Sequence, residues 1–328
     1  MPQVSSGQEG PLLFQRELED AIYSVNPDGS NLRKVADGRH PLRSPDGRFT
    51  LVTRRGAIVS ISSGGEEVVA MEAGDDYTWS PDGKRIAFQR GGNLFMVNRD
   101  GTEERLLVEG GEGGGWRPLW SPVDPMVVYY NRTRPTSMDA TDLFMVNIAT
   151  GKSKLVLEYT FIPQVPYPVS PDGTSLFIAR SGSEAVEVMN LKTGEFMSVG
   201  QSGGAQRPAW SPDGNRIVFE MADGVGGLHL RDLRDQTVRE LVPGRGEAVP
   251  GGAVWSPKGE VIAFHLMNWM EPKPSRICLI NVDGTYRMRR LAEGSWPLWA
   301  SMPSAVYPNT VTIPSPLTWG TLKYQLGP

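Results

Sequence analysis

The chain has 328 residues, of which 39% are hydrophobic and 21% are charged, and its formal net charge is −4. This composition is typical of a globular protein and excludes a chain that is disordered throughout. The weak negative charge gives no reason to expect nucleic-acid binding, and no apolar run approaches the roughly 18 residues that a membrane-spanning helix needs.

The first ten residues, MPQVSSGQEG, are expected to form a flexible segment. They contain no apolar region of the kind that a signal peptide requires. Regular structure is expected to begin after them, at the apolar run 12–16.

From there on, a phrase of the form Trp-Ser-Pro-Asp-Gly, followed by an apolar run, recurs roughly every 40 residues. Its clearest copy is WSPDGKRIAF, at residues 79–88. The other copies occupy residues 42–52, 119–130, 169–178, 209–219 and 254–264, and a weak copy occupies 298–307. Self-similarity at such a period is the signature of a repeat architecture.

One repeat unit, residues 77–108, has the pattern of four short β-strands separated by turns, and no segment shows a sustained helical period. Pro-Asp-Gly predicts a tight turn between the first two strands, because Pro fixes φ and Asp and Gly accept the next positions. The sequence NRDG at 98–101 predicts a second turn of this kind. We call the four strands of each unit a, b, c and d in chain order.

Strand b is apolar on both faces, with Ile86 and Phe88 on one side and Ala87 on the other. A sheet buried on both faces needs a neighbour on each side, which a closed ring of sheets supplies. The sequence therefore predicts an all-β fold, a seven-bladed β-propeller of four-stranded blades. Seven strand-b runs lie at residues 12–16, 50–54, 86–90, 128–132, 176–180, 217–221 and 262–266. Seven strand-a runs begin near residues 41, 77, 118, 167, 208, 253 and 297.

The two sets of strands are offset, so the chain begins inside a blade and ends its repeats with a lone strand a, SWPLWAS. We predict that this C-terminal strand a joins the N-terminal blade and closes the ring. The tail, residues 304–328, is β-rich, interrupted by prolines and nearly uncharged. It is expected to be ordered and to pack on the propeller or on a partner.

The phrase WSPDGKRIAF followed by LFMVNRDG resembles the TolB-type, WD-like propeller repeat, and the resemblance covers residues 11–303. It implies a bacterial protein of the periplasm or the extracellular space, with any signal already removed. TolB itself has six blades and an additional α/β domain, for which this sequence has no room, so its role is not carried over. Related propellers serve as partner-binding platforms, as accessory domains of serine peptidases and as polysaccharide lyases.

Loops b–c and d–a emerge on one face of a propeller, and this face carries the long insertions. They lie at residues 109–117, 132–142, 158–166 and 267–275. Variable loops on a constant scaffold are where binding is expected.

Five of the seven strands b end in arginine, at Arg16, Arg54, Arg90, Arg132 and Arg180. Equivalent positions form a ring, so these guanidinium groups are expected to surround the mouth of the central pore. Arg117 and Arg207 lie nearby, at the start of two strands a. Two interpretations stay open. The arginines could clasp neighbouring blades through acidic residues such as Asp37, Asp76, Glu112 and Glu158, or they could form a shared site for an anionic ligand or partner.

Eight of the nine tryptophans fall into two groups by their position in the repeat. Five of the nine tryptophans precede the repeated serine and are expected in the core: Trp79, Trp120, Trp210, Trp255 and Trp299. Trp116, Trp269 and Trp296 fall on the face of the arginines, and Arg with Trp is typical of interface hot spots. Aromatic rings also stack on sugars, so an anionic glycan is a further candidate ligand, and each ring could instead plug the pore locally.

Catalytic candidates are few, and no catalytic residue, metal or cofactor is expected. Residues 200–204 match the pattern G-x-S-x-G, but no helix follows them as a nucleophile elbow requires. His40, His265 and Asp76 could bind a metal of the kind that some lyase propellers use, although no ligand spacing supports it. The single cysteine, Cys278, is expected to be a buried thiol without chemistry, and it excludes an intrachain disulfide.

The leading interpretation is a non-enzymatic binding or scaffold propeller that recognises a protein or anionic partner on its b–c/d–a face. Its expected contact residues are Arg54, Arg90, Arg132, Arg180, Arg117, Arg207, Trp116, Trp269 and Trp296. One alternative is a carbohydrate-active enzyme, similar to a polysaccharide lyase, with its site at the pore mouth. Another is a structural subunit of an extracellular or envelope assembly.

Overall fold

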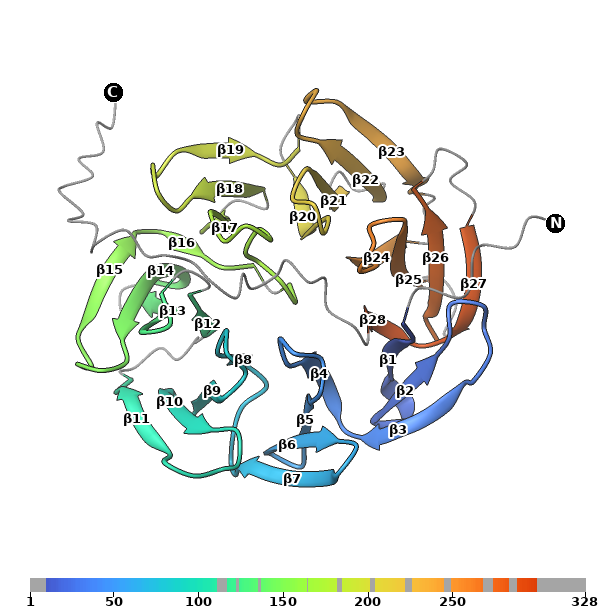
Figure 1. The fold of residues 1–328 in the computed structure, drawn as a ribbon. Coiled ribbons are helices and arrows are strands. Elements are labelled where there is room, and N and C mark those ends of the chain that lie inside the picture. The colour runs from blue at the N-terminus through green and yellow to red at the C-terminus, as the bar shows by residue number, and fades with distance from the viewer. Residues whose placement is uncertain are drawn as a thin grey trace.

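The computed structural model describes residues 10–299 except for ten short stretches. Those stretches are 111–116, 122–123, 135–136, 164, 182–184, 201–203, 222–225, 245–248, 268–273 and 283–287. Its strands form seven four-stranded antiparallel sheets arranged in a ring, as Figure 1 shows. The predicted seven-bladed propeller is confirmed.

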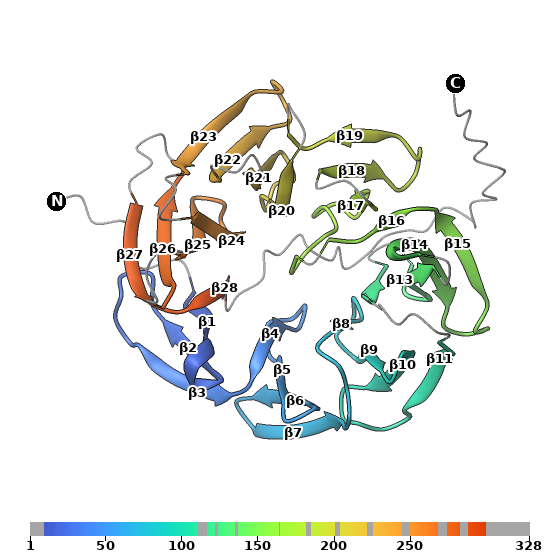
Figure 2. The ribbon, with the colours of Figure 1, turned by 180° about the vertical axis from the view of Figure 1, so that it is seen from behind.

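Each blade contributes strands a to d in order from the axis outward (Figures 1 and 2). Blade 1 consists of β28 (Ser295–Trp299), β1 (Leu12–Arg16), β2 (Ala21–Val25) and β3 (Arg33–Asp37), with a short 3-10 helix, η1 (Glu17–Glu19), after β1. Blade 2 consists of β4 (Arg39–Arg43), β5 (Thr50–Arg54), β6 (Ala57–Ser62) and β7 (Gly65–Ala70). Blade 3 consists of β8 (Tyr77–Trp79), β9 (Arg85–Arg90), β10 (Asn93–Asn98) and β11 (Arg105–Val108).

The remaining four blades follow the same order. Blade 4 consists of β12 (Leu119–Trp120), β13 (Val127–Arg134), β14 (Ser137–Asn147) and β15 (Ser153–Leu157). Blade 5 consists of β16 (Thr160–Phe161), β17 (Ser175–Arg180), β18 (Val186–Asn190) and β19 (Phe196–Ser198). Blade 6 consists of β20 (Ala205–Trp210), β21 (Arg216–Met221), β22 (Gly227–Asp232) and β23 (Val238–Pro243). Blade 7 consists of β24 (Val249–Trp255), β25 (Val261–Met267), β26 (Arg276–Asn281) and β27 (Met288–Glu293).

The ring is closed by the last described strand. β28 pairs antiparallel with β1, and the register places Trp299 opposite Leu12 and Leu298 opposite Leu13. Strand a of the first blade therefore comes from the C-terminal part of the described chain, as the offset between the two sets of runs predicts. The tail, residues 304–328, lies outside the described residues.

The core lies between blades, because strand b is buried on both of its faces. Ile86 and Phe88 pack in one cluster with Leu51 of the preceding blade, whereas Ala87 packs in another with Trp120 of the following blade. The three strand-b residues are fully buried. Each blade thus depends on both neighbours for its stability, which explains why the repeat recurs around a closed ring.

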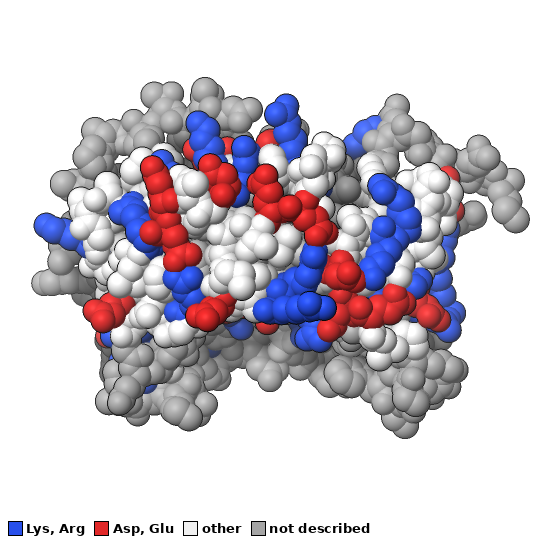
Figure 3. All heavy atoms as spheres, turned by 90° about the horizontal axis from the view of Figure 1, so that it is seen from below, with Lys and Arg blue, Asp and Glu red and all other residues white. Residues whose placement is uncertain are grey.

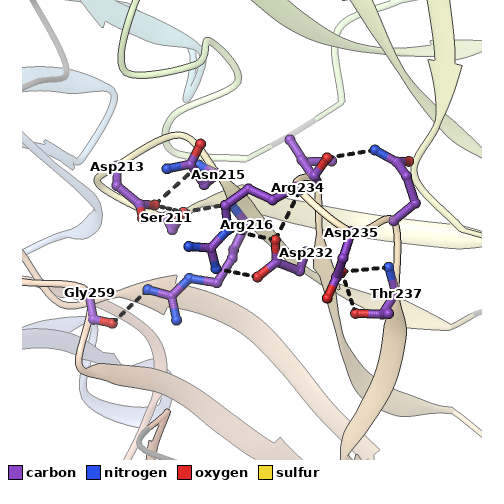
Figure 4. Close-up of polar contacts among 11 residues, drawn as sticks. Ser211, Asp213, Asn215, Arg216, Asp232, Arg234, Asp235, Thr237 and Gly259 are labelled. Atoms are coloured by element: carbon purple, nitrogen blue, oxygen red, sulfur yellow. Dashed lines mark hydrogen bonds and ion pairs between the residues drawn. The ribbon is translucent and has the colours of Figure 1, made fainter.

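The repeated serine organises the turn between strands a and b. In blade 6, the Ser211 hydroxyl donates to Asp213 Oδ1 at 2.5 Å and accepts the backbone N–H of Arg216 at 2.9 Å (Figure 4). The same pair of hydrogen bonds forms at Ser44, Ser80 and Ser170. The Arg216 guanidinium also reaches the next blade, where it donates to the Gly259 carbonyl at 3.3 Å.

Removing this hydroxyl should lower the free energy of unfolding, and the loss should be larger where the hydroxyl makes more hydrogen bonds. We expect Ser211→Ala to lower the free energy of unfolding by about 1–3 kcal/mol, because Asp213 loses a donor in a half-buried turn. Ser256 is equally buried but has Lys258 in place of the aspartate, and its hydroxyl accepts the Val261 N–H.

Ser256→Ala is therefore the matched control and should cost less. Urea unfolding of the two variants measures the difference, and a larger loss for Ser256→Ala would contradict this account of the turn.

The rim of the propeller carries charges of both signs in close mixture, as Figure 3 shows for one side of the molecule. This mixing agrees with the small net charge of −4 and gives that side no extended field of one sign.

Candidate functional site

Seven inner strands surround the axis, and one repeat position, within strand a or next to it, lies around the axis; in blade 5 this position follows β16. This position lies four residues before the repeated serine, or before Ala300 where the weak copy replaces that serine, and we call its residues the axial ring. The axial ring consists of His40, Asp76, Arg117, Pro166, Arg207, Gly252 and Trp296, the last from the weak copy of the repeat. All seven line one central cavity.

β-Bulges aim several of these side chains. The register of strands a and b shifts between Arg39 and Leu42 in blade 2, and corresponding shifts occur in blades 1, 6 and 7. The bulged residues His40, Arg207 and Trp296 have φ of 53°, 42° and 53°, in the left-handed region that non-glycine residues rarely occupy. Bulges redirect side chains beside functional sites, and the same strained conformation at the same position of three blades points to such a role.

The cavity has a volume of about 390 Å³, within the range of small-molecule pockets. Pro166 and Tyr167 of blade 5 line both this cavity and a second one of about 30 Å³. Tyr167 packs on the core cluster that contains Leu13 and Leu298 of blade 1, so it reaches across the axis. The main cavity is lined by the starts of strands a and therefore belongs to the b–c/d–a face, with Tyr167 toward its inner end.

The wall formed by blades 6, 7 and 1 carries Arg207 and Trp296. Arg207 Nη1 donates to Glu220 Oε2 at 2.9 Å, and its guanidinium lies 5.6 Å from the centre of the Trp296 ring. Gly252 occupies the axial position between them, and a Cβ there would come within 2.9 Å of the His265 ring and 3.2 Å of Trp296. The glycine therefore allows two bulky side chains from blades 6 and 1 to meet.

Two buried titratable groups support this wall from behind. Burial raises the pKa of Glu220, although Arg207 and the Gly252 N–H, at 2.7 Å from Glu220 Oε1, act against the shift. Burial, reinforced by the charge of Arg207, lowers the pKa of His265 to about 4. His265 is therefore neutral at pH 7, and its Nδ1 accepts the backbone N–H of Trp296 at 3.3 Å.

The wall formed by blades 2 and 3 is acidic. His40 Nδ1 lies 3.3 Å from Asp75 Oδ1, and the Tyr77 hydroxyl donates to the His40 carbonyl. Burial raises the pKa of Asp76, helped by Asp75 and opposed by Arg117 and His40. In the part of the chain that the structure describes, no N–H or O–H group donates to the Asp76 carboxylate.

The arginines that end strands b lie elsewhere. Arg54 Nη1 pairs with Glu66 at 2.9 Å, Arg180 Nε with Glu187 at 2.7 Å, and Arg90 with Glu104. Arg16 pairs with Glu19 at 3.1 Å. These four arginines are absent from the residues that line the central cavity. Strand b is second from the axis, and its arginines reach acids of their own blade.

Two of these arginines also contact the preceding blade. Arg54 Nε donates to the carbonyl of Asp37 at 3.0 Å, and Arg90 Nη1 donates to the carbonyl of Met71 at 3.1 Å. The geometry corresponds to the interpretation as clasps between blades, with backbone carbonyls of the preceding blade as the acceptors. Arg132 is half-buried, and its charge acts on the phenol of Tyr130.

The remaining expected contact residues divide into two groups. Arg117, Arg207 and Trp296 line the central cavity, where Arg117 Nη1 approaches the Ile162 carbonyl at 3.5 Å. Trp116 and Trp269, as well as Glu112, lie outside the described residues. The tryptophans that precede the repeated serine are buried, as expected, at Trp79, Trp120, Trp210, Trp255 and Trp299.

The sequence analysis did not predict three of the cavity residues, namely Asp75, Tyr77 and Gly252. It named Asp76 only as a possible clasp between blades or as a possible metal ligand. The repeat alignment contained the signal for the axial ring, since the residue four positions before each serine varies among charged, aromatic and small types. A position that varies within an otherwise constant strand is where a repeat scaffold places its specificity.

The candidate metal site does not assemble among the described residues. His265 lies behind Trp296 in blade 7, whereas His40 pairs with Asp75 in blade 2. The described ranges contain no group of three His, Cys, Asp or Glu side chains placed to hold a metal ion. Cys278 is buried, and burial raises the pKa of its thiol to about 11.

Within the described residues, no helix is both long and apolar enough to cross a membrane. Residues 201–203 of the G-x-S-x-G pattern lie outside them.

Three comparisons place the chain among known proteins, although no sequence model of a protein family matches it. Over 221 residues it is 29% identical to the Tol-Pal system protein TolB of Gluconobacter oxydans, covering 52% of this chain and 47% of TolB. Over 273 residues it is 26% identical to dipeptidyl-peptidase 5 of Porphyromonas gingivalis, covering 77% of this chain and 38% of the peptidase. The chain thus spans about half of one relative's length and less of the other's.

Among solved structures, an oligogalacturonate lyase of Vibrio parahaemolyticus is similar with a TM-score of 0.62 and 13% identity, covering 81% of this chain and 84% of the lyase. This likeness concerns the fold alone. The two sequence relatives named here are a Tol-Pal system protein and a peptidase, and the propeller is compatible with a binding or scaffold role without excluding an enzymatic one.

Proposed function

Because this chain is a seven-bladed propeller of TolB-type repeats, we propose that it is a binding protein of the bacterial envelope that holds a segment of a protein partner at the mouth of its central cavity. The proposal is of a scaffold without catalysis. It places the contact on the b–c/d–a face.

The observation that carries the proposal is the pair of Trp296 and Arg207. Trp296 is 42% exposed, which is unusual for so large an apolar side chain, and its backbone is held in a strained conformation. Arg207 lies beside it with a 42% exposed side chain. Tryptophan and arginine are the residues most enriched in interface hot spots.

The pre-organised setting strengthens this proposal. The His265 ring packs edge-on against the Trp296 ring with the ring centres 5.2 Å apart, and Glu220 holds Arg207, so both contact residues lose little side-chain freedom on binding. Arg117, on the opposite part of the axial ring, is the third contact we propose. Arg54, Arg90 and Arg180 are assigned to blade stabilisation instead, because each already pairs with a glutamate.

Capture of partners from an envelope extract tests this function. We expect Trp296→Ser to reduce the amount of cross-linked partner about tenfold, a hot-spot loss of at least 1.4 kcal/mol. Higher salt should weaken capture by the wild type, because Arg207 is partly exposed.

Lys84→Ser, in the Pro-Asp-Gly turn between β8 and β9 on the opposite face, is the control and should capture normally. Equal capture by Trp296→Ser and the wild type would reject the mouth as the binding site.

A further inference from the structure

The charges that line the central cavity are separated across it. Asp75 and Asp76 lie at the start of blade 3, and Arg207 lies in blade 6, so the two sets are three blades apart on a ring of seven (Figure 1). All three residues line the same volume of about 390 Å³. The two acids therefore face Arg207 across the cavity, while Arg43 of blade 2 and Arg117 of blade 4 line it on either side of the acids, and the charge of Arg117 acts on Asp76.

The negative wall has unused capacity for a cation. The Asp76 carboxylate accepts no hydrogen bond from the described residues, and burial makes its charge costly. Asp75 beside it is 59% exposed and, among the residues that the structure describes, its carboxylate pairs with one nitrogen of His40. The Tyr77 ring completes this wall and offers an apolar surface next to the carboxylates.

The positive wall has unused capacity for an anion. A guanidinium group has five N–H donors, and within the described part of the chain Arg207 uses one of them, on Glu220. Its remaining N–H donors belong to a side chain that is partly exposed and lies beside Trp296. A carboxylate could therefore bind Arg207 without displacing Glu220.

Between the charged walls the lining is apolar and of limited depth. Proline occurs at several lining positions, among them Pro41, Pro118 and Pro208, and Tyr167 lies toward the inner end. Apolar walls with a few convergent polar groups are typical of sites for small ligands. The charges of Asp76 and Arg207 together favour a ligand that is neutral overall but has two charged ends.

We propose that the central cavity binds a small zwitterion of the amino-acid or dipeptide class. The ligand ammonium group lies against Asp76 and Asp75, its carboxylate binds Arg207, and its body packs against Tyr77 and Trp296. The proposal goes beyond the capture of a protein partner and does not require it.

Calorimetric titration of the full chain with glycyl-leucine and its two blocked forms tests this site. N-acetyl-glycyl-leucine keeps only the carboxylate, and glycyl-leucine amide keeps only the ammonium group. We expect the zwitterion to bind the wild type at least about tenfold more tightly than either blocked form, as loss of a charged hydrogen bond implies.

Two variants separate the ends of the ligand. In Asp76→Asn, the preference for glycyl-leucine over its acetylated form should fall several-fold, because the ammonium group keeps only Asp75 as its partner. In Arg207→Gln, glycyl-leucine and its amide should bind alike. Asp235→Asn, in the distant turn of blade 6 shown in Figure 4, is the control and should retain the wild-type preference.

Absence of binding by glycyl-leucine at millimolar concentration would overturn the proposal, and so would equal affinity for all three compounds. Either result would leave the capture of a protein partner by Trp296 untouched, since that experiment uses no dipeptide. Equal partner capture by Trp296→Ser and the wild type, with dipeptide binding intact, would instead reject the proposed function.

Discussion

Replacing Phe88 with alanine should lower the free energy of unfolding by about 3–5 kcal/mol, the usual cost of removing a buried aromatic side chain. Phe88 is fully buried in β9 and stacks on Phe95 with the ring centres 5.7 Å apart. It also packs with Leu51 and Ile58 of blade 2. The variant loses contacts of two blades at once, so the cavity it leaves cannot close by the movement of one sheet.

Leu106→Ala in β11 is the control from the same blade. Leu106 is 47% exposed, and its replacement should change stability by no more than about 0.5 kcal/mol. Urea unfolding followed by tryptophan fluorescence measures both variants. A loss near 1 kcal/mol for Phe88→Ala would mean that the blades are less dependent on one another than the shared core implies.

The stability of the protein should fall by about 2 kcal/mol between pH 7 and pH 5 through His265 alone. Burial holds the pKa of His265 at about 4, below its value of 6.5 in the unfolded chain. Below pH 6.5 the unfolded state therefore binds a proton that the folded state does not. The contribution of His265 to stability is fully present above pH 6.5 and is lost as the pH falls toward 4.

Other groups shift in the opposite direction, so the comparison needs a variant. The pKa values of Glu220 and Asp76 are raised in the folded protein, and their contribution to stability declines as the pH rises through those values. His265→Gln cannot titrate but can still accept the Trp296 N–H. On going from pH 7 to pH 5, the unfolding free energy of the wild type should fall by about 2 kcal/mol relative to that of His265→Gln. Equal pH dependence would show that His265 is not held neutral.

The architecture could be predicted from the sequence because it depends on local signals that are repeated many times. Turn residues such as Pro-Asp-Gly and the apolar pattern of Ile86, Ala87 and Phe88 predicted blades that pack on both neighbours. Closure of blade 1 by the C-terminal strand a followed from the offset of the two sets of runs. Each of these inferences needs only backbone preferences and burial, which neighbouring residues determine.

The site could be predicted only in part from the sequence, because the direction of a side chain depends on partners far apart in the chain. Arg54 and Arg90 share one repeat position, but their direction is decided by Glu66 in strand d of blade 2 and by Glu104 just before strand d of blade 3. The aim of Trp296 depends on a β-bulge and on His265 of another blade. Sequence periodicity identifies which positions are equivalent but not which of them faces the axis.

The central claim is that strand a, and not the end of strand b, presents the binding residues. Thiol protection tests it directly, since the buried Cys278, with its raised pKa, contributes little background reactivity. Cysteines at two axial-ring positions, His40→Cys and Pro166→Cys, are compared with cysteines at two strand-b ends, Arg54→Cys and Arg180→Cys. In the presence of envelope extract, maleimide should label the two axial thiols several-fold more slowly while the rates at positions 54 and 180 stay unchanged. Protection at positions 54 and 180, with the axial thiols still reactive, would contradict the account.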